Sequence, residues 1–161
     1  MAAGHETTAN LIGNAAVCLH DHHDAARRLR ARPDTMAGAV EELLRLEPPV
    51  QLTSRMATVG TKLGDQPIAE GDQAFVSIGG ANRDPAMFSD PDALDLDRAL
   101  GVSLAFGHGV HFSAGAALAR VEGEEVLRRL IQLDPPIEER AMTFESGASA
   151  TFRRVNKLVL H

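Results

Sequence analysis

The stretch Phe106 to Arg120, FGHGVHFSAGAALAR, constrains the fold of this chain more than any other part of the sequence. Its three glycines, Gly107, Gly109 and Gly115, allow the backbone to take positive φ and to be approached closely. An alanine-rich helical pattern follows them at once. The stretch therefore predicts a tight loop that leads directly into a helix.

Apolar periodicity and turn residues predict the remaining elements. Helical patterns cover residues 2–20, 25–32, about 34–46 and 116–133, with a polar connector at 20–24. The period changes towards two between Val50 and Ile78, which predicts short antiparallel strands near 53–59, 66–68 and 73–78. Two Asp-Pro pairs favour an ordered meander over 82–100, and 141–161 is expected to form a β-hairpin. The expected fold is mainly α with small antiparallel β-sheets.

Composition excludes several classes of function. The chain has 161 residues, the size of one ordinary domain, and a net charge of −6 with no Trp or Tyr, which disfavours nucleic-acid binding. Its single cysteine, Cys18, cannot form an internal disulfide, and the start MAAGHETT lacks the features of a signal peptide. No early apolar stretch reaches the roughly 20 residues of a membrane span. We therefore expect a cytosolic protein that binds neither nucleic acid nor membrane.

The glycine-rich stretch resembles the heme-binding loop of the cytochrome P450 family, whose pattern is F-G-x-G-x-H-x-C-x-G-x-x-L-A-R. Three further stretches, AGHETT, AVEELLR and NRDPAMFSDPDALDLDR, resemble other motifs of this family and occur in the family's order. One position differs in a way that matters for chemistry. Ser113 stands where the family has the cysteine thiolate that ligates the iron, so it marks the metal position with a weak ligand or none.

The resemblance assigns roles to the remaining motif residues. It implies that Phe106, Gly107, His111 and Gly115 contact heme b, and that Arg55, in LTSRMAT, and His111 face its propionates.

On the opposite side of the heme, Glu6 and Thr7 of AGHETT would supply an acid and a hydroxyl for proton delivery, while Gly4 leaves room. The resemblance also implies a buried structural triad of Glu42, Arg45 and Arg98.

Each assignment has an alternative that carries no function. Glu42 and Arg45, three apart on one helix, also suit a solvated surface pair, and Arg55 an exposed strand residue. Ser113 could act as the N-cap of the helix that follows it, and His111 as a loop histidine bonded to backbone. His108 and His111 lack the further ligands that a zinc site needs. The group His20, His22 and His23 could bind a divalent metal, but a solvated loop is the favoured interpretation.

The resemblance covers residues 1–161 and implies one partial heme domain, running from the second half of the family's long central helix to the C-terminus. Three hypotheses follow. The first is the C-terminal portion of a heme monooxygenase, catalytically impaired, with a small organic substrate and a redox partner such as ferredoxin. The second is a non-catalytic interaction module whose exposed distal surface a protein partner covers. The third is a truncated remnant without function.

Overall fold

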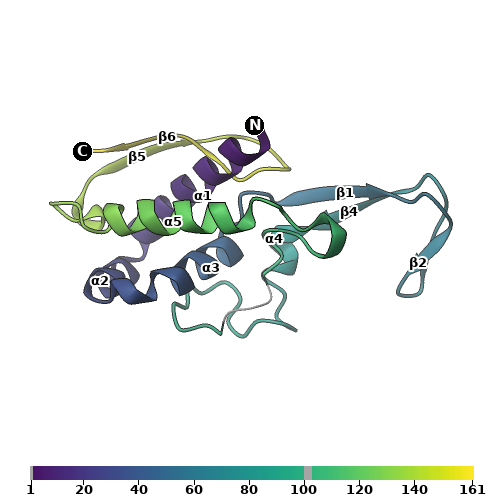
Figure 1. Ribbon diagram of the computed structural model, residues 1–161, viewed down its shortest axis with the longest axis horizontal. Coiled ribbons are helices and arrows are strands. Elements are labelled where there is room, and N and C mark those ends of the chain that lie inside the picture. The colour runs from purple at the N-terminus through teal and green to yellow at the C-terminus, as the bar shows by residue number, and fades with distance from the viewer. Residues whose placement is uncertain (1, 100–102) are drawn as a thin grey trace.

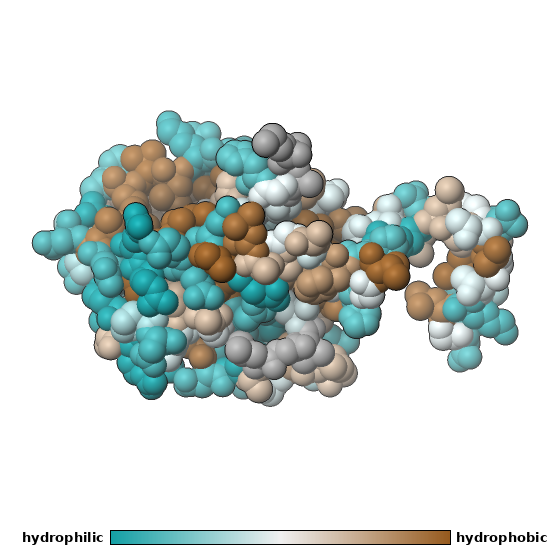
Figure 2. Space-filling model, viewed as in Figure 1, coloured by the Kyte–Doolittle hydropathy of each residue, from teal (hydrophilic) through white to brown (hydrophobic). Residues whose placement is uncertain are grey.

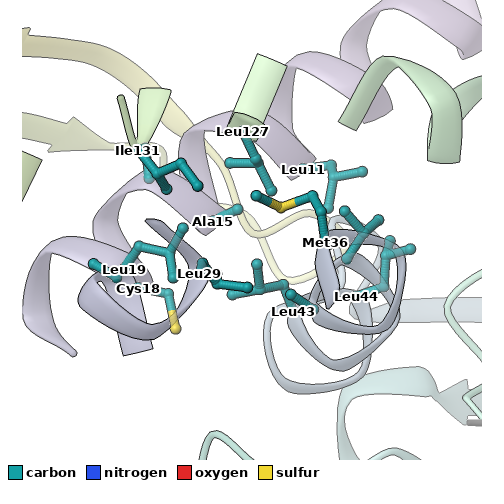
Figure 3. Close-up of a cluster of buried hydrophobic side chains, with 14 of the residues drawn as sticks. Leu11, Ala15, Cys18, Leu19, Leu29, Met36, Leu43, Leu44, Leu127 and Ile131 are labelled. Carbon is teal, nitrogen blue, oxygen red and sulfur yellow. The ribbon is translucent and has the colours of Figure 1, made fainter. Parts of the chain in front are cut away.

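Three helices form the centre of the protein, because each carries its apolar residues on the face that meets the other two (Figure 1). The computed structural model describes residues 2–99 and 103–161. The three helices are α1 (Ala2–Asp21), α3 (Met36–Leu46) and α5 (Ala116–Leu130). Figure 3 shows their buried side chains converging, with Leu11, Leu19, Leu43 and Leu127 at most 1% exposed.

A glycine sets the distance between these helices. A Cβ added at Gly123 of α5 would lie 3.3 Å from Leu11 Cδ2 on α1 and 3.5 Å from Val40 Cγ1 on α3. These contacts are close enough that a larger residue would push the helices apart. Gly123 therefore lets α5 lie directly against both helices, and so fixes where the glycine-rich loop joins the core.

Helix α2 (His23–Ala31) and a 3₁₀ turn (Pro33–Thr35) connect α1 to α3. The predicted polar connector at 20–24 is wrong in extent, since only His22 separates α1 from α2. The amide of His22 still donates to the Cys18 carbonyl at 3.1 Å, and the amide of Ala26 donates to the His22 carbonyl at the same distance. Backbone bonding of the helical kind thus continues across a segment whose side chains are polar.

The described residues also form three two-stranded antiparallel sheets. They pair β1 (Leu52–Met56) with β4 (Gln73–Ser77), β2 (Thr61–Leu63) with β3 (Gln66–Ile68), and β5 (Met142–Ser146) with β6 (Val155–Leu160). Figure 1 shows β1 and β4 leading away from the helices towards the projecting β2 hairpin. At the other side of the molecule, β6 lies against α1.

The expected fold class, mainly helical with small antiparallel sheets, is confirmed. The first strand is shorter than predicted and ends at Met56, and α5 ends at Leu130 rather than Leu133. A short helix, α4 (Ile78–Ala81), was not predicted because its sequence IGGA is rich in glycine. The Ser77 hydroxyl starts it by accepting the Gly80 amide at 3.1 Å. Within the described part of the chain, no helix is long and apolar enough to cross a bilayer.

Candidate functional site

The glycine-rich loop is closed by its own backbone. The Gly107 amide donates to the Leu104 carbonyl at 2.8 Å, and the Ser113 amide donates to the Phe106 carbonyl at 2.9 Å. Gly107 has φ of 78° and Gly109 has φ of 63°, values that favour glycine, whereas Gly115 has φ of −86°. The loop therefore needs two of its three glycines for their conformation, and the expectation of positive φ is not met at Gly115.

Ser113 lies at the exit of the loop with an exposed side chain. Helix α5 begins at Ala116, and its N-cap residue is Gly115, which offers no capping side chain. The backbone carbonyl of Ser113 accepts the Ala116 amide at 3.2 Å. The alternative that Ser113 is the N-cap is therefore wrong, because the helix starts two residues too late for it.

The aromatic residue at the start of the loop has contacts that the sequence did not predict. The Arg120 guanidinium lies over the Phe106 ring, 4.5 Å from its centroid, and the rings of Phe106 and Phe112 are 6.3 Å apart. Arg120 also pairs with Glu41 of α3. Glu41 directly precedes Glu42 in the E-E-x-x-R pattern. This neighbouring acid is the one sequence signal that could have indicated the Glu41–Arg120 ion pair.

Glu42, Arg45 and Arg98 meet, as the family resemblance implies. Arg45 donates to Glu42 through Nε (2.7 Å to Oε2) and Nη2 (2.8 Å to Oε1), and Arg98 Nε donates to Oε1 at 3.1 Å. The side chains of Glu42 and Arg45 are 4% and 2% exposed, so the alternative of a solvated surface pair is wrong. Burial opposes ionisation of Glu42, yet hydrogen bonds from Arg45, the Asp95 amide and Arg98 hold the pKa of its carboxyl below the ordinary value.

A buried asparagine joins this cluster to the glycine-rich loop. Asn82, which is fully buried, accepts a hydrogen bond from Arg45 Nη1 at its backbone carbonyl (2.9 Å). Its side-chain Oδ1 accepts the Leu104 amide at 2.7 Å, just before Phe106. Sequence reasoning passed over Asn82, although it opens the NRDP motif.

Two residues expected at the heme edge are exposed. Arg55 on β1 donates to the Thr53 hydroxyl at 3.2 Å and the Ser54 carbonyl at 2.8 Å, both on its own strand. His111 ends the short 3₁₀ turn Gly109–His111 inside the loop, and its carbonyl lies 3.3 Å from where a Cβ at Gly107 would be. His111 thus shares the loop with Ser113, whereas the contacts of Arg55 are local to its strand.

The acid and the hydroxyl expected on α1 lie in its first turns. The Glu6 carboxylate is 3.4 Å from Arg154 Nη1, which precedes β6, and Thr7 is half-buried. The next residue, Thr8, is buried and its hydroxyl donates to the Gly4 carbonyl at 3.0 Å. Glu6 is therefore paired with the C-terminal hairpin.

The only cysteine cannot take the place of Ser113. Cys18 lies in the helical core, and burial, with Glu47 and Asp21 nearby, raises the pKa of its thiol to about 12. Such a thiol stays neutral and unreactive near neutral pH. Across residues 2–99 and 103–161, no group of three or more His, Cys, Asp or Glu side chains is arranged to hold a metal ion.

Comparison with known proteins identifies the family. The cytochrome P450 family model matches residues 1–133. The chain belongs to the cytochrome P450 family. It is 42% identical over 135 residues to a biotin biosynthesis cytochrome P450 from Bacillus subtilis, covering 84% of this chain and 34% of that protein. It is 44% identical over 142 residues to cytochrome P450 107B1 from Saccharopolyspora erythraea, covering 88% and 35%.

Solved P450 structures have the same fold over nearly all of this chain. P450BioI, in complex with hexadec-9Z-enoic acid ligated acyl carrier protein, superimposes with a TM-score of 0.90 at 38% identity, covering 97% of this chain and 40% of that one. CYP109B1 from Bacillus subtilis gives a TM-score of 0.89 at 35% identity, covering 97% and 42%. The chain thus spans about a third of the length of its curated relatives. It has the fold of one portion of a P450.

The donor chemistry of the loop does not fit a thiolate-ligated heme. Iron in P450s is held by a soft, electron-donating thiolate, and position 113 offers a neutral hydroxyl instead. Cys18 belongs to the helical core and stays protonated, so it cannot supply the sulfur. Residue 113 of the loop therefore carries a hydroxyl and not a thiol.

Proposed function

We propose that residues 1–161 form a partial heme domain of the P450 type, the C-terminal portion of a monooxygenase that acts on a small organic substrate. The proposal includes heme b as cofactor, a redox partner such as ferredoxin, and the cytosol as compartment. It rests on the family, on the closed geometry of the glycine-rich loop, and on the buried Glu42–Arg45–Arg98 cluster that Asn82 links to that loop.

In this proposal each motif residue has a defined task. Phe106, Gly107 and Gly115 would shape the surface that holds the heme, and Arg55 and His111 would donate to its propionates. Glu6 and Thr7 would hold and move protons on the α1 side. Glu6 would have to leave Arg154 for this, and a contact of 3.4 Å between half-exposed groups is weak enough to exchange.

The conclusion about activity rests on the identity of residue 113, which is serine. A thiolate donates the electron density that favours cleavage of the O–O bond, and a neutral serine hydroxyl lacks this property. We therefore infer that thiolate-dependent hydroxylation is lost or very slow in this chain, although the loop around position 113 is closed by its own backbone hydrogen bonds.

The test is the reduced carbon monoxide difference spectrum of the chain mixed with heme, recorded beside the Ser113→Cys variant. We expect the red-shifted, thiolate-type band only in the variant. The same band in the parent chain would show that another sulfur reaches the iron and would overturn the role given to Ser113. Failure of both proteins to take up heme would reject the heme-domain proposal for this chain.

A second function, a non-catalytic interaction module, is favoured by a different observation. Leu118 and Val121, which lie three apart on α5, are 62% and 63% exposed. Apolar side chains on one helix face suit contact with a protein partner. A stoichiometric complex that forms equally well with the parent chain and Ser113→Cys, and without heme, would support this function over the first.

A further inference from the structure

Arg120 connects helix α3 to the aromatic side chain of the glycine-rich loop. Its guanidinium pairs with Glu41 through Nε to Oε1 and through Nη2 to Oε2, the second at 3.3 Å. The same group stacks on Phe106, 4.5 Å from the ring centroid. The side chains of Arg120 and Glu41 are 34% and 24% exposed, so water only partly screens the contact.

The stacked ring belongs to the residue that holds position 113. The Phe106 carbonyl accepts the Ser113 amide at 2.9 Å, and this hydrogen bond closes the loop. A planar guanidinium can bind a carboxylate at its edge and an aromatic ring at its face at the same time. Because Glu41 binds Arg120, and Arg120 covers Phe106, a displacement of Glu41 would reach Ser113 through three contacts.

We propose that Glu41 and Arg120 are positioning residues, which set the Phe106 ring and, through the Phe106 carbonyl, the place of residue 113. The two adjacent carboxylates of α3 then have different tasks, since Glu42 binds Arg45 and Arg98 of the buried cluster. The inference rests on the proposed function in one respect: it takes residue 113 as the position that faces the heme iron.

A simpler account is an ion pair that merely joins α3 to α5. It predicts that any arrangement restoring opposite charges at 41 and 120 restores the loop, with or without a guanidinium over Phe106. The chain also offers a matched control on the same helix. Glu125 and Arg129 form an exposed pair at 2.6 Å, with side chains 55% and 79% exposed, and they lie beyond the first turns of α5 that follow the loop.

The experiment measures hydrogen–deuterium exchange of the peptide covering residues 104–115, relative to peptides from β5 and β6, in the full chain without heme. The variants are Glu41→Gln, Arg120→Gln, both together, and the charge swap Glu41→Arg with Arg120→Glu. The controls are Glu125→Gln and Arg129→Gln. Normalising to β5 and β6 separates a local opening of the loop from a general loss of stability.

We expect each single variant to speed exchange in the loop by about two- to fivefold, the range for one partly exposed ion pair and one stacked cation. Exchange in the double variant should be little faster than in the more affected single variant, because both residues act through the same Glu41–Arg120–Phe106 contacts. The charge swap should not restore protection, since no guanidinium then covers Phe106. Both controls should leave loop exchange unchanged.

Unchanged loop exchange in Glu41→Gln, additive effects in the double variant, or full protection in the charge swap would each overturn the proposal. Should Arg120→Gln unfold, Glu41→Gln carries the test, because it leaves the stacked arginine in place. The measurement needs no heme, so its failure would remove the positioning role alone, whereas a failed carbon monoxide test would remove the proposed function alone.

Discussion

Buried carboxylates in this protein are held by arginines whose remaining N–H groups bind backbone carbonyls. Arg45 and Arg98 donate to Glu42 and also to carbonyls of the meander, at Pro91 and Ser89 respectively. Away from this cluster, Arg30 binds both oxygens of Glu138, at 2.9 and 2.8 Å, and donates to the Ile131 carbonyl at 2.6 Å. Lysine could not make these contacts together, because its donors radiate from one nitrogen.

The Glu138 pair gives the stability of the protein a predictable dependence on pH. Hydrogen bonds from Arg30 hold the pKa of the Glu138 carboxyl below its ordinary value of 4.5, against the effect of burial. A lowered pKa in the folded state means that the stabilisation is complete above that ordinary value and is lost as pH falls through the folded pKa. The pKa of the Glu42 carboxyl is also lowered, so its contribution to stability is lost on acidification in the same way.

We therefore expect Glu138→Gln to be less stable than the parent at neutral pH, and to lose less stability on acidification below the ordinary carboxyl pKa. The measurement is the urea midpoint by circular dichroism at a series of pH values from neutral to acid. Glu125→Gln, on the exposed surface of α5, is the control and should follow the parent curve. Parallel curves for Glu138→Gln and the parent would show that this ion pair does not contribute to acid sensitivity.

At the scale of elements, sequence periodicity predicted the helices that bury apolar residues. It missed features that depend on backbone hydrogen bonds or on the packing of distant elements. The helices that form the core were found because Leu11, Leu43 and Leu127 recur on buried faces. The connector at 20–24 was misjudged, because polar side chains hid the continuing backbone hydrogen bonds at His22. Within the site, the spacing of Glu42 and Arg45 alone left a solvated pair open, and the family resemblance of E-x-x-R and a meander arginine predicted the buried cluster. Arg120 over Phe106 could not be predicted, since it depends on how two distant elements pack.

The glycine-rich loop offers a prediction at this same scale. Gly107 has φ of 78°, and a Cβ there would lie 3.3 Å from the His111 carbonyl oxygen, so Gly107→Ala should cost about 1–2 kcal/mol of stability. Gly4→Ala is the matched control, because Gly4 lies in α1 with open space around it and alanine favours a helix there. Equilibrium unfolding in urea should thus shift in opposite directions for the two variants. A neutral or stabilising Gly107→Ala would contradict the loop geometry described.

At the scale of the whole molecule, the helical core is well buried while other apolar side chains remain in contact with solvent. Figure 2 shows apolar surface over the face where α5 runs in Figure 1. Leu118 and Val121 of α5 are 62% and 63% exposed, and Met56 and Phe75 of the β1–β4 sheet are 68% and 65% exposed. The P450 relatives are about three times as long as this chain, and a longer chain buries a larger fraction of its surface on folding.

This exposure predicts that the purified chain associates with itself as its concentration rises. Apolar side chains three apart on a helix form one continuous strip, and their burial against another molecule is favourable. Sedimentation velocity at several concentrations should show the weight-average mass increasing, and Leu118→Lys with Val121→Lys should reduce that increase. Leu63→Lys is the control, because Leu63 is 71% exposed on the β2 hairpin, far from α5 in sequence and on a separate element. A monomer at all concentrations, or an equal effect of Leu63→Lys, would show that the strip on α5 is not what brings the molecules together.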